Sequence, residues 1–206
     1  MAHTSLLVCA SRKNAMLTTK GYRKRCKRFV APGYPHAVTF TCYKSLPLFN
    51  YEAVCKMMVD SILSSRNSLR FDLWAWVIMP WHVHLLLLPP PEIETISPIL
   101  KAIKQSMSRK YINQYRCSPH ILNEIETGKA NPKHRFWQPG GGHDRIIYGN
   151  REVSNWVDYI HNNPVNEGYV DDPSNWKWSS ARAWLLDDES VLTINWETLP
   201  NLGQKK

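Results

Sequence analysis

The feature that most constrains the fold is a pair of apolar, strand-like runs separated by a very short connection. Residues Phe71–Met79 form the first run, His82–Leu88 form the second, and only Pro80-Trp81 lies between them. Runs this close together pair as neighbouring antiparallel strands, because a parallel pair needs a long crossover connection. The sequence therefore predicts a tight hairpin, with the second run as a central strand of a sheet.

The remaining periodic segments extend this hairpin into a sheet with helices. Residues Ala37–Tyr43 are rich in β-branched and aromatic residues and predict an earlier strand, and a helical apolar repeat follows Asn50. Ser97-Pro98 is typical of a helix start, and Asp144–Tyr148 predicts a short edge strand. The order β-α-β-β-α followed by an edge strand predicts an α+β protein with a ferredoxin-like antiparallel sheet and helices packed on it.

Two histidines in the second run share one face of the predicted strand. His82 and His84 are two residues apart, and side chains at that spacing project to the same side. Val83, Leu85 and Leu87 make the opposite face apolar. Two buried imidazoles need polar partners, which indicates either metal ligands or core histidines hydrogen-bonded to their neighbours.

A helix is predicted near residues 151–163, and one tyrosine stands outside its apolar stripe. The stripe follows the helical period and consists of Val153, Trp156, Val157 and Ile160. Tyr159 instead falls in a row with Asn155 and Asn163 at spacings of four residues. We expect Pro164 to end the helix and to hold Asn163 in an extended conformation. A tyrosine on a polar helix face can also be an ordinary surface residue.

The charge of the chain favours a nucleic-acid partner. The formal net charge is +9 over 206 residues, and the excess is clustered at 20–28 and again along the predicted helix at 101–116. Clusters of this kind are typical of phosphate-backbone binding, although a solvated basic face is the alternative.

The length and the cysteines bound the class of protein. A chain of 206 residues fits one well-buried domain, which we expect at 21–186, with tails at 1–20 and 187–206. The five cysteines are odd in number and have no Cys-x-x-Cys spacing, so the sequence predicts a protein of the reducing cytoplasm without a disulfide framework. No apolar stretch approaches the roughly 20 residues that span a bilayer, so no membrane association is expected.

Several short motifs, in a fixed order, resemble one known family. They are Met79-Pro-Trp-His-Val-His-Leu-Leu86, Phe136-Trp-Gln138, Tyr159-Ile-His-Asn-Asn-Pro-Val165, Gly168-Tyr-Val170 and Trp178-Ser-Ser180. Between about Arg23 and Trp184 the chain resembles the single-tyrosine HUH transposases, and within them the REP-associated tyrosine transposase branch. The resemblance implies the HUH endonuclease fold.

The resemblance also implies a site. His82 and His84 would bind a divalent metal with Asn163 as the third ligand, and Tyr159 would be the nucleophile. Neutral imidazoles with an amide oxygen favour Mg²⁺ or Mn²⁺. The chain departs from its relatives in carrying Trp81 before the first histidine, where a small polar residue is common. Asn163 also stands where insertion-sequence transposases often carry glutamine.

The function implied is a metal-dependent transposase or endonuclease. It would cleave and rejoin single-stranded DNA at palindromic, REP-like hairpins through a 5′-phosphotyrosine, as a monomer or homodimer that joins the nucleoid when bound to DNA. Two alternatives stay open: a domesticated or non-catalytic single-strand binding protein, and a replication initiator-like nickase. The residues expected to contact DNA are Arg23, Lys24, Arg25, Lys27, Arg28, Lys104, Trp137 and His161.

Overall fold

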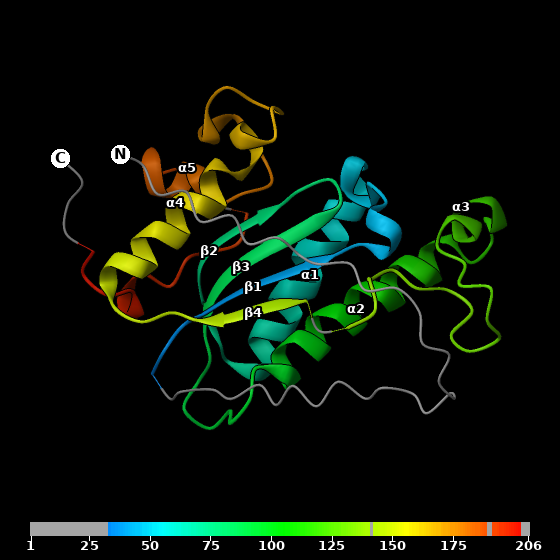
Figure 1. Cartoon of the computed structure of the whole chain (residues 1–206), viewed down its shortest axis with the longest axis horizontal. Helices are drawn as coiled ribbons and strands as arrows, with labels where there is room; N and C mark the ends of the chain where they lie inside the picture. The colour runs from blue at the N-terminus through cyan, green and yellow to red at the C-terminus, as the bar shows by residue number, and fades with distance from the viewer. Residues whose placement is uncertain (1–32, 141, 189–190, 203–206) are drawn as a thin grey trace, which may run out of the picture.

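The fold is built on one four-stranded antiparallel sheet in the order β2-β3-β1-β4 (Figure 1). The computed structural model describes residues 33–140, 142–188 and 191–202. The strands are β1 (His36–Thr41), β2 (Asp72–Ile78), β3 (His82–Leu88) and β4 (His143–Ile146). The predicted α+β class, the hairpin of β2 with β3 and the edge position of β4 are confirmed.

Helices lie on both faces of the sheet. Figure 1 shows α1 and α2 on one face and α4 with α5 on the other. The helices are α1 (Glu52–Leu69), α2 (Ser97–Tyr115), α3 (Pro119–Glu124), α4 (Asn150–Asn166) and α5 (Ala181–Leu185). Single 3-10 turns occupy Tyr43–Ser45, Leu48–Asn50, Pro173–Asn175 and Trp196–Thr198.

The alternation of side chains along β3 separates two hydrophobic cores. Val83, Leu85 and Leu87 pack with α1 and α2 in the larger core. Leu86 points to the other face and belongs to the smaller core beneath α4. His82 and His84 have the same parity as Leu86, so the period of two places both imidazoles on the α4 side of the sheet.

The apolar stripe predicted for the tyrosine helix holds α4 on the sheet. Val153, Val157 and Ile160 are buried in the smaller core, where Ala75 and Val77 come from β2. Burial of side chains of this size stabilises the contact by roughly 1.5–3 kcal/mol each. The stripe sets the rotation of α4, and this rotation decides which residues of the helix face the two histidines.

The prediction that Pro164 ends this helix is wrong. Pro164 lies inside α4, which continues to Asn166. Proline removes only its own N–H donor, and the turn is still closed by the Glu167 N–H bonding to the Asn163 carbonyl at 3.0 Å. Asn163 is therefore helical rather than extended. Its side chain stays in line with that of Tyr159, four residues earlier, on the side of α4 that faces β3.

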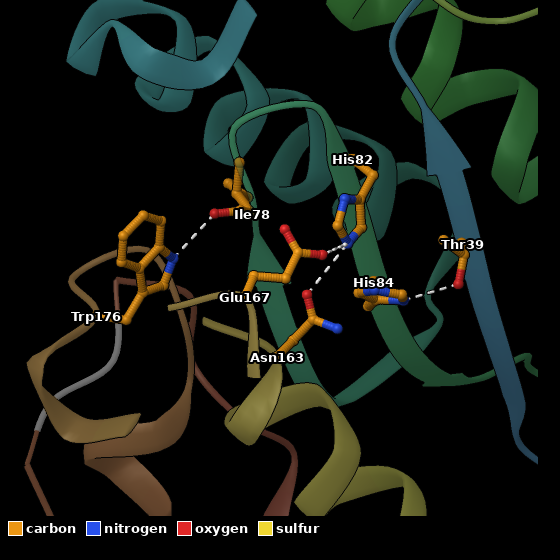
Figure 2. Close-up of polar contacts among 7 residues, drawn as sticks. All are labelled: Thr39, Ile78, His82, His84, Asn163, Glu167 and Trp176. Carbon is orange, nitrogen blue, oxygen red and sulfur yellow. Dashed lines mark hydrogen bonds and ion pairs between the residues drawn. The ribbon is translucent and has the colours of Figure 1, made fainter. Parts of the chain in front are cut away.

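The segment after α4 is tied to the outer strand β2. The Trp176 indole N–H donates to the Ile78 carbonyl at 3.0 Å (Figure 2), and Val77 and Ser179 form an isolated antiparallel bridge. These contacts bring the connection between α4 and α5 back beside the β2-β3 hairpin. The C-terminal turn of α4 is thus held near the first histidine.

Described residues also pack along β2 within the range expected to be a C-terminal tail. Leu192 and Ile194 are buried, and Asn195 forms a pair of hydrogen bonds with the backbone of Leu73. The domain limits at 21 and 186 stay a prediction, because the first of them lies outside the described residues. The same is true of the tail at 1–20 and of the basic residues at 23–28. Within the described ranges, no helix combines the length and apolarity that a bilayer crossing requires.

Candidate metal and tyrosine site

The four residues predicted for the site lie together between β3 and α4. The imidazole rings of His82 and His84 are 4.6 Å apart at an interplanar angle of 84°. Asn163 reaches the first of them, with its Oδ1 3.2 Å from the His82 Nε2 (Figure 2). Tyr159 reaches the second, with its ring centroid 5.3 Å from the His84 ring. The fold thus joins two segments that are about 80 residues apart in the chain.

Burial keeps both histidines neutral. Their side chains are only 3% and 4% exposed. Burial lowers the pKa of His82 to about 4, because the imidazolium form loses hydration. It lowers the pKa of His84 to about 3, and the neighbouring His82 adds to the effect. At neutral pH each ring therefore keeps a nitrogen lone pair, which is the form that binds metals.

Thr39 on β1 fixes the orientation of the second histidine. Its Oγ1 lies 2.7 Å from the His84 Nδ1 (Figure 2). When Nδ1 donates to this hydroxyl, the lone pair of His84 is on Nε2, which is buried and has no hydrogen-bond partner among the described residues. Gly142 permits the close backbone approach beside this threonine, since a Cβ there would lie 2.2 Å from the Thr39 carbonyl oxygen.

The chemistry of these residues fits a divalent cation. Adjacent ligands of an octahedral ion with bonds near 2.1 Å lie about 3 Å apart, close to the spacing of the His82 Nε2 and the Asn163 Oδ1. Over the ranges that the structure describes, no three His, Cys, Asp or Glu side chains form an ion site by themselves. The Asn163 amide oxygen, 3.2 Å from the His82 Nε2, therefore belongs to the donor set. The His82 Nδ1 is buried without a described partner, so this histidine has no counterpart of Thr39.

Tyr159 is the accessible member of the group. Its side chain is 45% exposed, and its ring meets the edge of Trp156 at 5.2 Å. Beside it lies an open pocket of about 310 Å³, lined by Arg145, Glu152, Asn155, Trp156 and Tyr159. An extended nucleotide has room to approach the phenol from this side.

Sequence reasoning missed one carboxylate at the site. The Glu167 Oε1 lies 3.9 Å from the His82 Nε2 (Figure 2), and the side chain is 29% exposed. The Trp81 ring packs against His82 at a tilt, with ring centroids 4.1 Å apart and an interplanar angle of 56°. Burial raises the pKa of Glu167, and its interaction with the Trp81 side chain opposes that rise. The spacing of four residues from Asn163 was the available signal, but the helix was expected to end before it.

The described DNA-contact candidates divide between surface and core. Lys104 lies on α2 and lines an open groove of about 560 Å³ together with Lys101, Arg109 and Gly140. Trp137 borders this groove but is only 6% exposed, and its indole N–H is bonded to the Lys104 carbonyl. Base stacking on Trp137 is therefore disfavoured.

His161 does not fit the DNA-contact role predicted for it. Its side chain is buried, and its Nε2 lies 2.8 Å from the Ser180 Oγ. His161 is two residues from the tyrosine in sequence, so it was expected near the DNA. The helical rotation instead points it away from Tyr159 and toward α5, where its ring contacts Trp184. Arg23, Lys24, Arg25, Lys27 and Arg28 lie outside the described residues, so their contact with DNA stays a prediction.

The chain belongs to the family described as "Transposase IS200 like". That family matches residues 29–163, more than half of the chain, and the match includes both histidines, the tyrosine and Asn163. It ends four residues before Glu167.

Two curated relatives are named as REP-associated tyrosine transposases. A candidate REP-associated tyrosine transposase of Haemophilus influenzae is 27% identical over 111 residues, which cover 53% of this chain and 58% of the relative. The REP-associated tyrosine transposase of Escherichia coli K12 is 26% identical over 125 residues, which cover 61% and 63%. The matched part thus spans about three fifths of each relative.

A solved structure shares the fold. It is described as a REP-associated tyrosine transposase bound to a REP hairpin and aligns with a TM-score of 0.60. The alignment covers 86% of this chain and 96% of the other, at 20% sequence identity. The similarity supports the α+β architecture found above.

Proposed function

We propose that this protein is a metal-dependent transposase that cleaves and rejoins single-stranded DNA at hairpin-forming elements through Tyr159. The observation that carries the proposal is the contact of an exposed tyrosine with a buried, neutral histidine pair. Contact with a buried histidine is not required of a tyrosine that serves only as a surface residue. Family membership and the REP-associated names of the relatives support the same reading.

The chemistry would be a phosphoryl transfer to the phenol. A divalent cation, held by His82, His84 and Asn163, would neutralise the scissile phosphate and orient it for in-line attack. The Tyr159 oxygen would form a bond to phosphorus, lose its proton, and displace the 3′ oxygen as a free 3′-OH. The phosphodiester energy is kept in the 5′-phosphotyrosine, so a second 3′-OH can reverse the reaction on another strand without ATP.

Single-stranded DNA with a hairpin is the proposed partner. The solved relative is described as bound to such a hairpin, and the basic groove on α2 carries Lys101, Lys104 and Arg109. The pocket beside Tyr159 is open to an unpaired strand. In a perfect duplex the scissile phosphodiester is less accessible to a side chain that rises from a helix surface.

A covalent-capture experiment tests the proposal. A labelled, hairpin-containing single strand is incubated with the full chain and Mn²⁺, and adducts are resolved under denaturing conditions. Wild-type protein should form an adduct and release a free 3′-OH. Tyr159→Phe should form none while binding within a few fold, because only the hydroxyl is lost.

Tyr169→Phe is the matched control, since Tyr169 is similarly exposed at 46%, follows the end of α4 and contacts Trp176 rather than a histidine. It should retain adduct formation. An adduct that persists in Tyr159→Phe would reject the nucleophile, and tight binding without any adduct in wild-type protein would favour the non-catalytic binding alternative.

A further inference from the structure

We infer that Glu167 is a fourth protein ligand of the divalent cation, so that two imidazoles, one amide oxygen and one carboxylate hold the ion. The inference rests on the proposed function, because it concerns the cation that His82, His84 and Asn163 would bind. It adds a charged donor that lies beyond the residues matched by the family.

Helix geometry places the two oxygen donors on one row. Asn163 and Glu167 are four residues apart, so both side chains point in nearly the same direction. The row reaches Glu167 only because α4 continues through Pro164, with the Glu167 N–H closing the turn on the Asn163 carbonyl. One helix end thus presents an amide and a carboxylate side by side.

Both oxygens converge on the same ring nitrogen. The Asn163 Oδ1 lies 3.2 Å and the Glu167 Oε1 lies 3.9 Å from the His82 Nε2. Figure 2 draws both contacts as dashed lines. Ligands of an octahedral ion with bonds near 2.1 Å are separated by about 3 Å when adjacent and about 4.2 Å when opposite. The two measured distances fall within that range, so both oxygens can join His82 around one cation.

Trp81 lies between the first histidine and the carboxylate. Its indole ring packs on His82, and its side chain interacts with Glu167. Among the described residues, no lysine or arginine forms an ion pair with this carboxylate, and its charged oxygen lies near the neutral His82 ring. A partly buried carboxylate beside a neutral imidazole is costly without a cation, which gives the contact a metal-binding explanation.

A carboxylate would change the properties of the ion. It reduces the net charge of the ion with its protein ligands from +2 to +1 and occupies one of about six coordination positions, leaving two for phosphate oxygens. It also favours hard cations that prefer oxygen. The expected consequence is tighter binding of Mn²⁺ than three neutral ligands provide.

Direct Mn²⁺ titration tests the inference without using activity. The electron paramagnetic resonance signal of free Mn²⁺ is followed as full-length protein is added at pH 7.5. Glu167→Gln should raise the Kd about 10-fold or more, since it removes the charge but keeps the shape. Asp171→Asn removes the same charge from a nearby exposed residue and should change the Kd less than 2-fold. His84→Ala provides the benchmark for loss of a ligand.

Trp81→Phe is the second variant, because it keeps an aromatic ring on His82 and removes the indole N–H that interacts with Glu167. It should weaken Mn²⁺ binding by less than Glu167→Gln does. Unchanged affinity in both variants, together with lost binding in His84→Ala, would overturn the role of Glu167 and leave the proposed function intact. No binding by wild-type protein would overturn both. Thermal unfolding in chelator should show Glu167→Gln at least as stable as wild type, because the carboxylate is the group that is costly without a cation.

Discussion

The Tyr159 ring on α4 meets the His84 ring on β3 edge-on, with centroids 5.3 Å apart and planes at 80°. The far side of His84 is bonded to Thr39 on β1. The tyrosine, the histidine and the threonine therefore form a chain of contacts across one helix and two strands. Because the three side chains come from packed secondary structure rather than from loops, their mutual geometry is well fixed.

Thr39→Val should weaken Mn²⁺ binding while leaving the fold unchanged. Valine has nearly the same shape, but it cannot accept a hydrogen bond from the His84 Nδ1–H. That bond keeps the lone pair of His84 on Nε2. Loss of such a contact typically lowers metal affinity by about 10–100-fold. Thr193→Val, at an exposed position outside the sheet, is the control and should bind Mn²⁺ like wild type. Equal affinities for both variants, measured by titration, would argue against an orienting role for Thr39.

The metal-free protein should lose stability as the pH falls from about 6.5 toward 4. The unfolded chain takes up protons on histidine near pH 6.5, whereas the folded pKa of His82 is about 4 and that of His84 about 3. The contribution of the two neutral histidines to the free energy of unfolding is therefore complete above pH 6.5. It is lost as the pH falls through this window, by up to about 1.4 kcal/mol per pH unit for each histidine.

Urea unfolding in the presence of chelator measures this slope. His84→Gln should lose less stability between pH 6.5 and 5 than wild type does, because one of the two depressed groups is gone. His120→Gln, at an exposed position, should behave like wild type. A slope that His84→Gln does not change would show that the pH dependence arises elsewhere.

The groove on α2 should contribute to DNA affinity through charge. Lys101 and Arg109 both line it, and each phosphate they neutralise on a single strand adds about −0.7 to the slope of log affinity against log salt. Replacing both residues by glutamine should flatten the slope by up to about 1.4 units in salt-dependent binding assays. Lys129→Gln with Lys133→Gln removes the same charge from a different loop and should leave the slope nearly unchanged. A larger change in slope for the Lys129 and Lys133 variant than for the groove variant would show that the DNA does not bind in this groove.

Ser180→Ala should destabilise the packing of α4 on β2. The Ser180 hydroxyl accepts a hydrogen bond from the Trp76 backbone N–H at 2.9 Å and lies 2.8 Å from the His161 Nε2. All three residues are buried. Removing a buried hydrogen-bonding partner costs about 1–3 kcal/mol of unfolding free energy. Ser154→Ala, at a half-buried position on α4, is the comparison and should cost less in a denaturant titration. Equal losses would mean that the Ser180 contacts contribute little.

The sequence by itself determined the elements and their exposed and buried faces. The hairpin of β2 with β3 followed from two apolar runs joined by Pro80-Trp81, and the common face of His82 and His84 followed from the period of two. The stripe through Val153, Val157 and Ile160 likewise followed from the helical period. These features depend on local periodicity, which a single chain displays directly.

Only the tertiary structure decided what surrounds the histidines. Pro164 was expected to end the helix, but packing of α4 on the sheet and the closing turn at Glu167 carry the helix past it. The bond from Thr39 to His84 and the burial of His161 against Ser180 join residues far apart in the chain. No local pattern encodes such contacts, because they arise when separate elements pack. The environment of the site, including its carboxylate, was therefore fixed by the packing of α4 against β3.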